Sequence, residues 1–139
     1  MNLIEFLTAR LDSRAQHARL AMTEVGSDPP EQWLWLGSGM VAIRGQPEEC
    51  VALSVRHIGL AAHIAANDPA QVLADVDADR RILARCAQWQ QNSRSGDPSA
   101  VALGLAAEVL VWELAARYAR HPHYRTAWRP APLLTDRQP

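Results

Sequence analysis

The sequence predicts an α+β fold that is mainly α, with three long helices, one short helix and a small antiparallel β-hairpin. Two Asp-Pro pairs, at residues 68–69 and 97–98, each open a long stretch with the apolar spacing of a helix. The Asp carboxylate accepts from free amides of the first turn, and Pro at the first helical position gives up no hydrogen bond. Trp and Leu alternate around residue 35, which is typical of a strand. We expect a single domain over residues 1–130 and a flexible tail over 131–139.

The first helix is predicted over residues 2–25. Asn2 and Glu5 have the spacing of a capping box, in which each side chain accepts from the backbone amide of the other residue. The Gly- and Pro-rich stretch at 26–30 ends the helix. The apolar residues recur at three- and four-residue steps; they are Leu3, Phe6, Leu7, Leu11, Ala18, Met22 and Val25. We expect this stripe to lie in the core, with partner binding as the alternative.

The hairpin is predicted over residues 32–44, with a turn at Gly37-Ser38-Gly39. Trp33 and Trp35 lie on one face of the first strand, and Leu residues lie on the other. A two-stranded ribbon is barely stable alone. We therefore expect one face to pack on the helices and the other, with Trp33 and Trp35, to meet a partner chain.

The region after the hairpin is predicted as a loop over 45–49, a short third strand or extended segment over 51–55 and a short helix over 56–66. The central helix then begins after Asp68, with an apolar stripe of Val72, Val76, Leu83 and Ala87 and with Cys86 beside it. Burial beside this stripe raises the pKa of a thiol and leaves it inert.

The last long helix is predicted over residues 98–120. Its apolar residues surround it on all sides, which predicts the most buried helix of the fold. Gly104 indicates a close approach to a neighbour, and Glu108 is expected to need a polar partner.

The composition narrows the functional classes. A net charge of −1 provides no bulk attraction to nucleic acid or to anionic membranes. No run of 18 apolar residues occurs, so no membrane span and no membrane partner are expected. The start lacks a secretory signal pattern, and Cys50 and Cys86 form no CxxC motif, so we expect a cytoplasmic protein. All 14 basic residues are Arg, which indicates a GC-rich genome.

The strongest candidate for a functional motif is residues 117–130, here called the C-terminal motif. It holds Arg, His and aromatic residues and no acid. Aromatic faces with Arg can stack on bases and hold phosphates. In the structural interpretation, which we favour, Arg117 and Arg120 complement the end of the helix and Tyr124 and Trp128 pack onto the core. An acidic protein partner ranks next, and nucleic acid ranks last.

Metal binding is a weaker hypothesis. His57 and His63 are six residues apart, which does not place two ligands on one helix face. A metal site of His63 and His121 with Asp68 or Asp75 is possible if the end of the last helix meets the start of the central helix. We favour a structural role for His63, in which its ring forms hydrogen bonds within the protein. We predict no metal, no cofactor and no catalytic residue.

Acidic residues on the central helix call for a cation. Asp75 and Asp79 are like charges four residues apart, which is unfavourable unless a cation lies between them. Arg125 or Arg129 is the expected partner.

Three stretches of the chain, IEFLTARLD, HIAANDPAQVLADVDADRRIL and LAARYARHPHYRTAWRP, follow a common pattern. They resemble a family of small uncharacterised proteins from high-GC Gram-positive bacteria and their phages, known only as a domain of unknown function, with the pattern FLxARLxE, HIAxxDPARVLxEVxAKRRIL and LPYAxHPDYRxEWRP. The chain has Asp79, His123 and Ala127 where the pattern has Lys, Asp and Glu, and it matches least over 30–60. The matching positions include His63, Asp68, Pro69, Arg80, Arg81, Tyr118, His121, Pro122, Tyr124, Arg125, Trp128, Arg129 and Pro130. The resemblance implies no activity, cofactor or catalytic residue.

The sequence favours a small non-enzymatic interaction or regulatory protein that contacts a protein partner or a second copy of itself, through the Trp33 and Trp35 hairpin or the first helix. The alternative is a protein that binds a small ligand, metal or nucleotide, with an enzyme as one form of it. A further alternative is nucleic-acid binding through the C-terminal motif. The ligand-binding alternative would use His63, Arg81, Tyr118, His121 and Arg125. The full set of candidate binding residues is His63, Arg81, Tyr118, His121, Tyr124, Arg125, Trp128 and Arg129.

Overall fold

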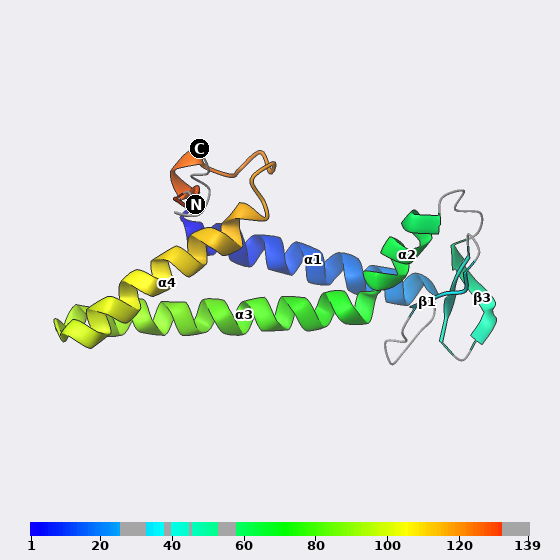
Figure 1. Ribbon diagram of the computed structural model, residues 1–139, viewed down its shortest axis with the longest axis horizontal. Helices are drawn as coiled ribbons and strands as arrows, with labels where there is room; N and C mark the ends of the chain where they lie inside the picture. Colours follow the sequence, from blue (N-terminus) through cyan, green and yellow to red (C-terminus); the bar gives the residue numbers. More distant parts are fainter. Residues whose placement is uncertain (26–32, 38–39, 45, 53–57, 132–139) are drawn as a thin grey trace, which may run out of the picture. The chain divides into compact units, whose positions relative to one another are not determined.

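The computed structural model describes residues 1–25, 33–37, 40–44, 46–52 and 58–131. The fold is α+β and mainly α, as predicted (Figure 1). Its elements are α1 (Leu3–Val25), β1 (Trp33–Trp35), β2 (Val41–Ile43), β3 (Gln46–Ala52), α2 (Ile58–Ala66), α3 (Pro69–Asn92), the 3-10 helix η1 (Ser93–Ser95), α4 (Pro98–Ala116) and the 3-10 helix η2 (Thr126–Trp128).

The chain divides into two compact units. The first, here called the α4 unit, contains residues 1–11 and 79–139, and the second, here called the sheet unit, contains residues 12–78. Helices α1 and α3 therefore each contribute one part to each unit. The expected tail falls almost entirely on residues 132–139, which lie outside the described residues, so the domain boundary at residue 130 stays a prediction.

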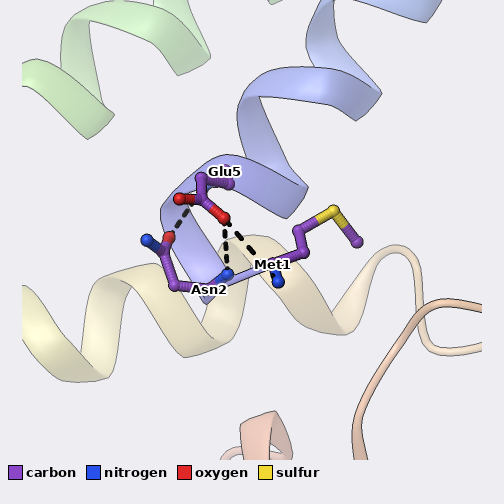
Figure 2. Close-up of polar contacts among 3 residues, drawn as sticks. All are labelled: Met1, Asn2 and Glu5. Atoms are coloured by element: carbon purple, nitrogen blue, oxygen red, sulfur yellow. Dashed lines mark hydrogen bonds and ion pairs between the residues drawn. The ribbon is translucent and has the colours of Figure 1, made fainter.

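The capping box at the start of α1 is confirmed (Figure 2). The amide of Asn2 donates to Glu5 Oε2 at 2.8 Å, and the amide of Glu5 donates to Asn2 Oδ1 at 2.9 Å. The terminal ammonium of Met1 lies 3.9 Å from the same carboxylate. These contacts satisfy amides that have no partner inside the helix and so determine where α1 begins.

The sheet unit contains a three-stranded antiparallel sheet in the order β1-β2-β3. Trp33 lies opposite Ile43, and Trp35 lies opposite Val41. The central strand β2 is buried along its whole length. The hairpin is confirmed, and the third strand predicted over 51–55 is confirmed at residues 51 and 52, whereas 53–55 lie outside the described residues. Strand β3 begins at Gln46, so the loop predicted over 45–49 is wrong for residues 46–49. Polar residues and Pro47 hide this strand in the sequence, and both are tolerated because β3 is an edge strand whose pairing is irregular.

Helix α3 begins as predicted. The amide of Gln71 donates to Asp68 Oδ1 at 2.7 Å, and Asp68 itself is buried. The apolar stripe is confirmed at Val76 and Leu83, which are buried, whereas Ala87 is exposed. Cys86 is also buried, and burial raises the pKa of its thiol as expected.

Helix α4 differs from its prediction in two ways. It ends at Ala116 rather than near residue 120, so Tyr118 lies in the turns that follow it. It is also not covered on all sides, because most of its apolar side chains and Glu108 are exposed. Its buried residues are Gly104, Ala107, Val111, Leu114 and Ala115. An apolar surface on all sides leads to burial only when neighbours cover all sides, and α4 has described neighbours on one side.

Gly104 marks the closest approach of α4 to the turn before it. A Cβ atom at this position would lie 2.6 Å from the Cβ of Ser93 and 2.9 Å from its Oγ. Both distances are shorter than side chains allow, so only glycine lets α4 rest on η1.

We expect Gly104→Ala to lower the free energy of unfolding by about 1–3 kcal/mol, because the added methyl group must displace Ser93. Adding Ser93→Gly should recover much of this loss. Gly59→Ala on α2 is the matched control, because no atom lies within 4 Å of its Cβ position and it should be neutral or stabilising. Urea unfolding followed by circular dichroism measures all variants, and equal losses for Gly104→Ala and Gly59→Ala would contradict the prediction.

Candidate functional site

Phe6 of α1 lies at the centre of a cluster of rings in the α4 unit, here called the aromatic cluster. Its side chain is 0 % exposed. The ring centroids of Trp128 and His121 lie 5.1 and 5.5 Å from that of Phe6, and those of Tyr118 and Tyr124 lie 6.1 and 6.3 Å away. Three of these contacts are edge-to-face, the arrangement that aromatic rings prefer. Four of the predicted candidates are therefore brought together by a residue at the other end of the chain.

A series of tight turns places these rings. After α4, the amide of His121 donates to the carbonyl of Tyr118 at 2.8 Å, and the amide of Tyr124 donates to that of His121 at 2.9 Å. The 3-10 helix η2 then carries Trp128, which is 8 % exposed. Side chains three residues apart in such turns point to the same side. The helical part of this segment is limited to Thr126–Trp128.

His121 lies between two N–H groups, and a neutral imidazole ring can accept a hydrogen bond from one of them. Arg10 Nη1 from α1 faces its Nε2, and the amide of His123 lies 3.1 Å from its Nδ1. A guanidinium cannot accept a hydrogen bond, so Nε2 must be the acceptor and the ring must be neutral. Burial lowers the pKa of His121, and the charges of Arg10 and His123 lower it further.

Cations lie over two rings of the aromatic cluster. The guanidinium carbon of Arg10 is 5.9 Å from the centroid of Phe6, and that of Arg125 is 5.4 Å from the centroid of Trp128. Two buried polar atoms, Arg10 Nε and the Tyr118 hydroxyl, have no hydrogen-bond partner among the described residues. The cluster therefore offers donors and positive charge but no acid.

Asp79 forms an ion pair with a different Arg from the two that were expected. Arg117 Nη1 donates to Asp79 Oδ2 at 2.7 Å, and the aspartate is buried. Arg125 and Arg129 were the expected partners. Arg117 reaches Asp79 because it directly follows the last turn of α4, and no spacing rule connects residues so far apart in the chain.

The remaining candidates are placed elsewhere. Arg81 and Arg129 are exposed, and His63 is an exposed residue of α2 whose carbonyl accepts from Asn67 Nδ2 at 2.8 Å. Trp33 lines a hollow of the sheet unit together with His17 and Pro69, whereas Trp35 is 41 % exposed. A second hollow, on the α4 unit, has a volume of about 500 Å³ and is lined by Met1, Pro122, His123, Tyr124 and Arg125.

The exposed side of α4 was not predicted from the sequence. Leu105 and Val109 are 62 % and 50 % exposed, and Val101, Leu103 and Leu110 are exposed as well. Among the described residues, α4 is also the one helix that is long and apolar enough to cross a membrane by length and composition alone. The expectation of no membrane span stays a prediction. The sequence itself could have indicated this exposure. It predicts two other long helices and one short helix, which are too few to surround a helix that is apolar on all sides.

Comparison with known proteins identifies a family but no activity. A family model described as a family of unknown function (DUF6221) matches residues 1–130. The chain belongs to this family. A search of curated proteins and a search of solved structures found no match. The family match therefore includes α1, α4 and the C-terminal motif, and any function must be argued from the geometry of these elements.

The described part of this family member contains no metal-binding group. No set of three or more His, Cys, Asp or Glu side chains among its described residues could hold a metal ion. His121 in particular faces two donors. Its acceptor nitrogen, Nε2, is already used by Arg10.

We expect Phe6→Ala to lower the free energy of unfolding by about 3–5 kcal/mol and to release the C-terminal motif before the whole chain unfolds. Under native conditions, trypsin should then cut after Arg125 much faster than in the wild type. Leu7→Ala is the matched control, because Leu7 is similarly buried at 1 % exposure but is not an aromatic partner of the motif. Equal acceleration of this cut in both variants would contradict a specific role for Phe6.

We expect the protein to lose stability as the pH falls below about 6.5, the ordinary pKa of His121. The pKa of His121 is lowered in the folded state, so the unfolded state takes up a proton first and acid favours unfolding. Above that pH, where His121 is neutral in both states, its full contribution to the free energy of unfolding is present. The melting temperature of His121→Gln should therefore fall less between about pH 8 and pH 5 than that of the wild type. His17→Gln, at an exposed position, is the control and should follow the wild type; a His121→Gln curve parallel to the wild type would refute the linkage.

Proposed function

We propose that this protein is a small non-enzymatic interaction protein that acts through protein–protein contacts on the exposed side of α4. The observation that carries the proposal is the exposure of Leu105 and Val109 at 62 % and 50 % within a helix of 19 residues. Soluble monomers rarely expose continuous apolar surface, and such surface is typical of an interaction site. Five large apolar side chains of Pro98–Ala116 are exposed, against two acids and no base, so the contact is mainly apolar.

The C-terminal motif supports this proposal because its rings are used inside the molecule. Trp128 is 8 % exposed and lies against Phe6, and Arg125 lies over Trp128. Stacking on nucleic-acid bases needs free ring faces. We therefore interpret the motif as the part that holds the α4 unit together, and we place the contact surface on α4.

Membrane insertion is less favoured than protein contact. Glu108 and Glu113 lie within α4, and charged side chains are costly inside a bilayer. One side of α4 is already covered through Gly104 and Ala107. A cytoplasmic location and an origin in high-GC Gram-positive bacteria or their phages are part of this proposal; they are supported by the free buried Cys86 and by basic residues that are all Arg.

Small-ligand binding is the second candidate function. It rests on the hollow of the α4 unit, where His123, Tyr124 and Arg125 surround a volume of about 500 Å³ and could receive an anion. It ranks second because two residues expected in such a site, His63 and Arg81, do not line this hollow.

The test is affinity capture with the full chain as bait in a lysate of its own source cells. We expect the wild type to retain a defined protein, or untagged copies of itself, that Leu105→Gln/Val109→Gln no longer retains, because polar groups on the contact surface remove the apolar gain. Arg125→Gln/Arg129→Gln is the control and should behave as the wild type. If Arg125→Gln/Arg129→Gln loses the captured protein while Leu105→Gln/Val109→Gln keeps it, the contact surface lies on the C-terminal motif and the proposal is wrong.

A further inference from the structure

We propose that the hollow of the sheet unit binds a small planar aromatic carboxylate, whose ring lies against Trp33 and whose charge lies near Arg14 and His17. This inference goes beyond the proposed function, because the hollow lies on the sheet unit and uses no residue of α4. It also gives Trp33 a role other than the partner contact that the sequence predicts.

One face of α1 forms a wall of this hollow. The residues that line it follow one another at three- and four-residue steps, which places them on one side of the helix. They are Arg14, His17, Ala18 and Ala21. The two Ala residues leave space that larger side chains would fill. The hollow has a volume of about 270 Å³, near the lower limit of about 300 Å³ for ligand pockets, so the ligand must be as small as one or two fused rings.

The rest of the lining is mainly apolar and includes an aromatic ring. Pro69 and Val72 belong to the first turn of α3, and Pro69 is buried. Trp33, at the start of β1, lines the hollow and is only half-buried. Its indole ring is therefore available to a second ring, and aromatic pairs gain more than the area that they bury. This lining favours a flat aromatic ligand over a sugar or a bare anion.

The ionisable side chains of the lining are basic. Arg14 and His17 lie three residues apart on one helix face, and no acid is among the described residues that line the hollow. Arg14 also has a partner within the protein, but a guanidinium has five N–H donors and can bind a carboxylate in addition. His17 donates from one ring nitrogen in its neutral form. A carboxylate accepts at both oxygens, so it matches these two donors.

Asn67 adds a hydrogen-bond acceptor to the lining. Its Nδ2 lies 2.8 Å from the carbonyl oxygen of His63 and 3.4 Å from Nδ1 of the same residue. Because the amide nitrogen is used by α2, the Oδ1 atom is the group that is left for a ligand. The neighbouring acid, Asp68, accepts from the amide of Gln71 and so caps α3. An aromatic acid that also carries an N–H group, such as an indole carboxylate, fits this set of partners.

The first test is an NMR titration of the purified, ¹⁵N-labelled full chain with indole-3-carboxylate. The chain has five Trp residues, and the indole N–H signal of Trp33 is the one that is missing from Trp33→Phe. We expect this signal to shift more than any other indole signal, with a dissociation constant on the order of 100 µM, as for a small ligand in an open site.

Two further probes separate the ring from the charge. Indole-3-carboxamide has the ring without the charge and should bind about tenfold more weakly. Acetate has the charge without the ring and should leave the Trp33 signal unchanged. Equal binding of the carboxamide, or a largest shift on a Trp signal other than that of Trp33, would overturn the inference.

The second test changes the lining by substitution. Ala21→Leu fills the hollow and should abolish binding without lowering the free energy of unfolding, because the longer side chain adds apolar contacts. Arg14→Gln should raise the dissociation constant about tenfold, because the charged donor is lost. Circular dichroism confirms that the helices of each variant are intact.

The matched controls carry the same substitutions outside the hollow. Ala74→Leu on α3 and Arg19→Gln on α1 change exposed residues that do not line it. Both should bind indole-3-carboxylate as the wild type does. Undiminished binding by Ala21→Leu and Arg14→Gln, or equal losses in the controls, would refute the proposed site.

The outcomes separate this inference from the proposed function. Leu105→Gln/Val109→Gln should bind indole-3-carboxylate normally, and Ala21→Leu should still retain the protein captured from the lysate. If the Trp33 signal does not shift while capture depends on α4, the ligand site fails and the proposed function stands. If the Trp33 signal shifts as expected but nothing is captured through α4, the ligand site stands and the proposed function fails.

Discussion

Packing of rings on Phe6 holds the end of the chain. Residues 117–130 form turns and one short 3-10 helix, so they have few backbone hydrogen bonds of their own. Their position depends on the side chains of Tyr118, His121, Tyr124 and Trp128, which surround one buried ring. The capping box (Figure 2) places that ring, because it determines where α1 begins. The amide of Phe6 donates to the carbonyl of Asn2 at 3.0 Å.

This arrangement explains why a motif rich in Arg and aromatic residues is not by itself a binding site. The rings are used in the core of the α4 unit, and Arg10, Arg117 and Arg125 each have a partner: His121, Asp79 and the face of Trp128, respectively. Neutral His121 follows from the same geometry, since Arg10 needs an acceptor. The Arg, His and aromatic side chains that were the strongest candidates for a binding site therefore mainly stabilise the fold.

Helix α4 is the opposite case, because its sequence is typical of the core but much of its surface is exposed. Its residues are those of a core helix, yet one narrow stripe is covered, and Gly104 allows η1 to approach there. The uncovered surface carries large apolar residues, among them Leu105 and Val109. An apolar composition shows that a helix surface is more stable when it is removed from water. It does not show whether residues of the same chain or of another chain cover that surface.

Local features of this fold could be predicted from the sequence because their causes lie within a few residues. The capping box of Asn2 and Glu5, the start of α3 at Asp68 and the close approach at Gly104 all depend on neighbours or on the absence of a side chain. The mainly α architecture follows from the same periodicities. Strand β3 was placed too late because an edge strand tolerates polar residues and Pro that carry no clear alternation.

Only the tertiary structure decided which distant residues meet. Phe6 joins Trp128, and Arg117 joins Asp79, across separations for which helix and strand periodicity give no information. The burial of α4 was mispredicted for the same reason, since the number of neighbours around a helix is a property of the whole fold. Sequence patterns determine which surfaces avoid water, and the packing of complete elements determines which of those surfaces are covered.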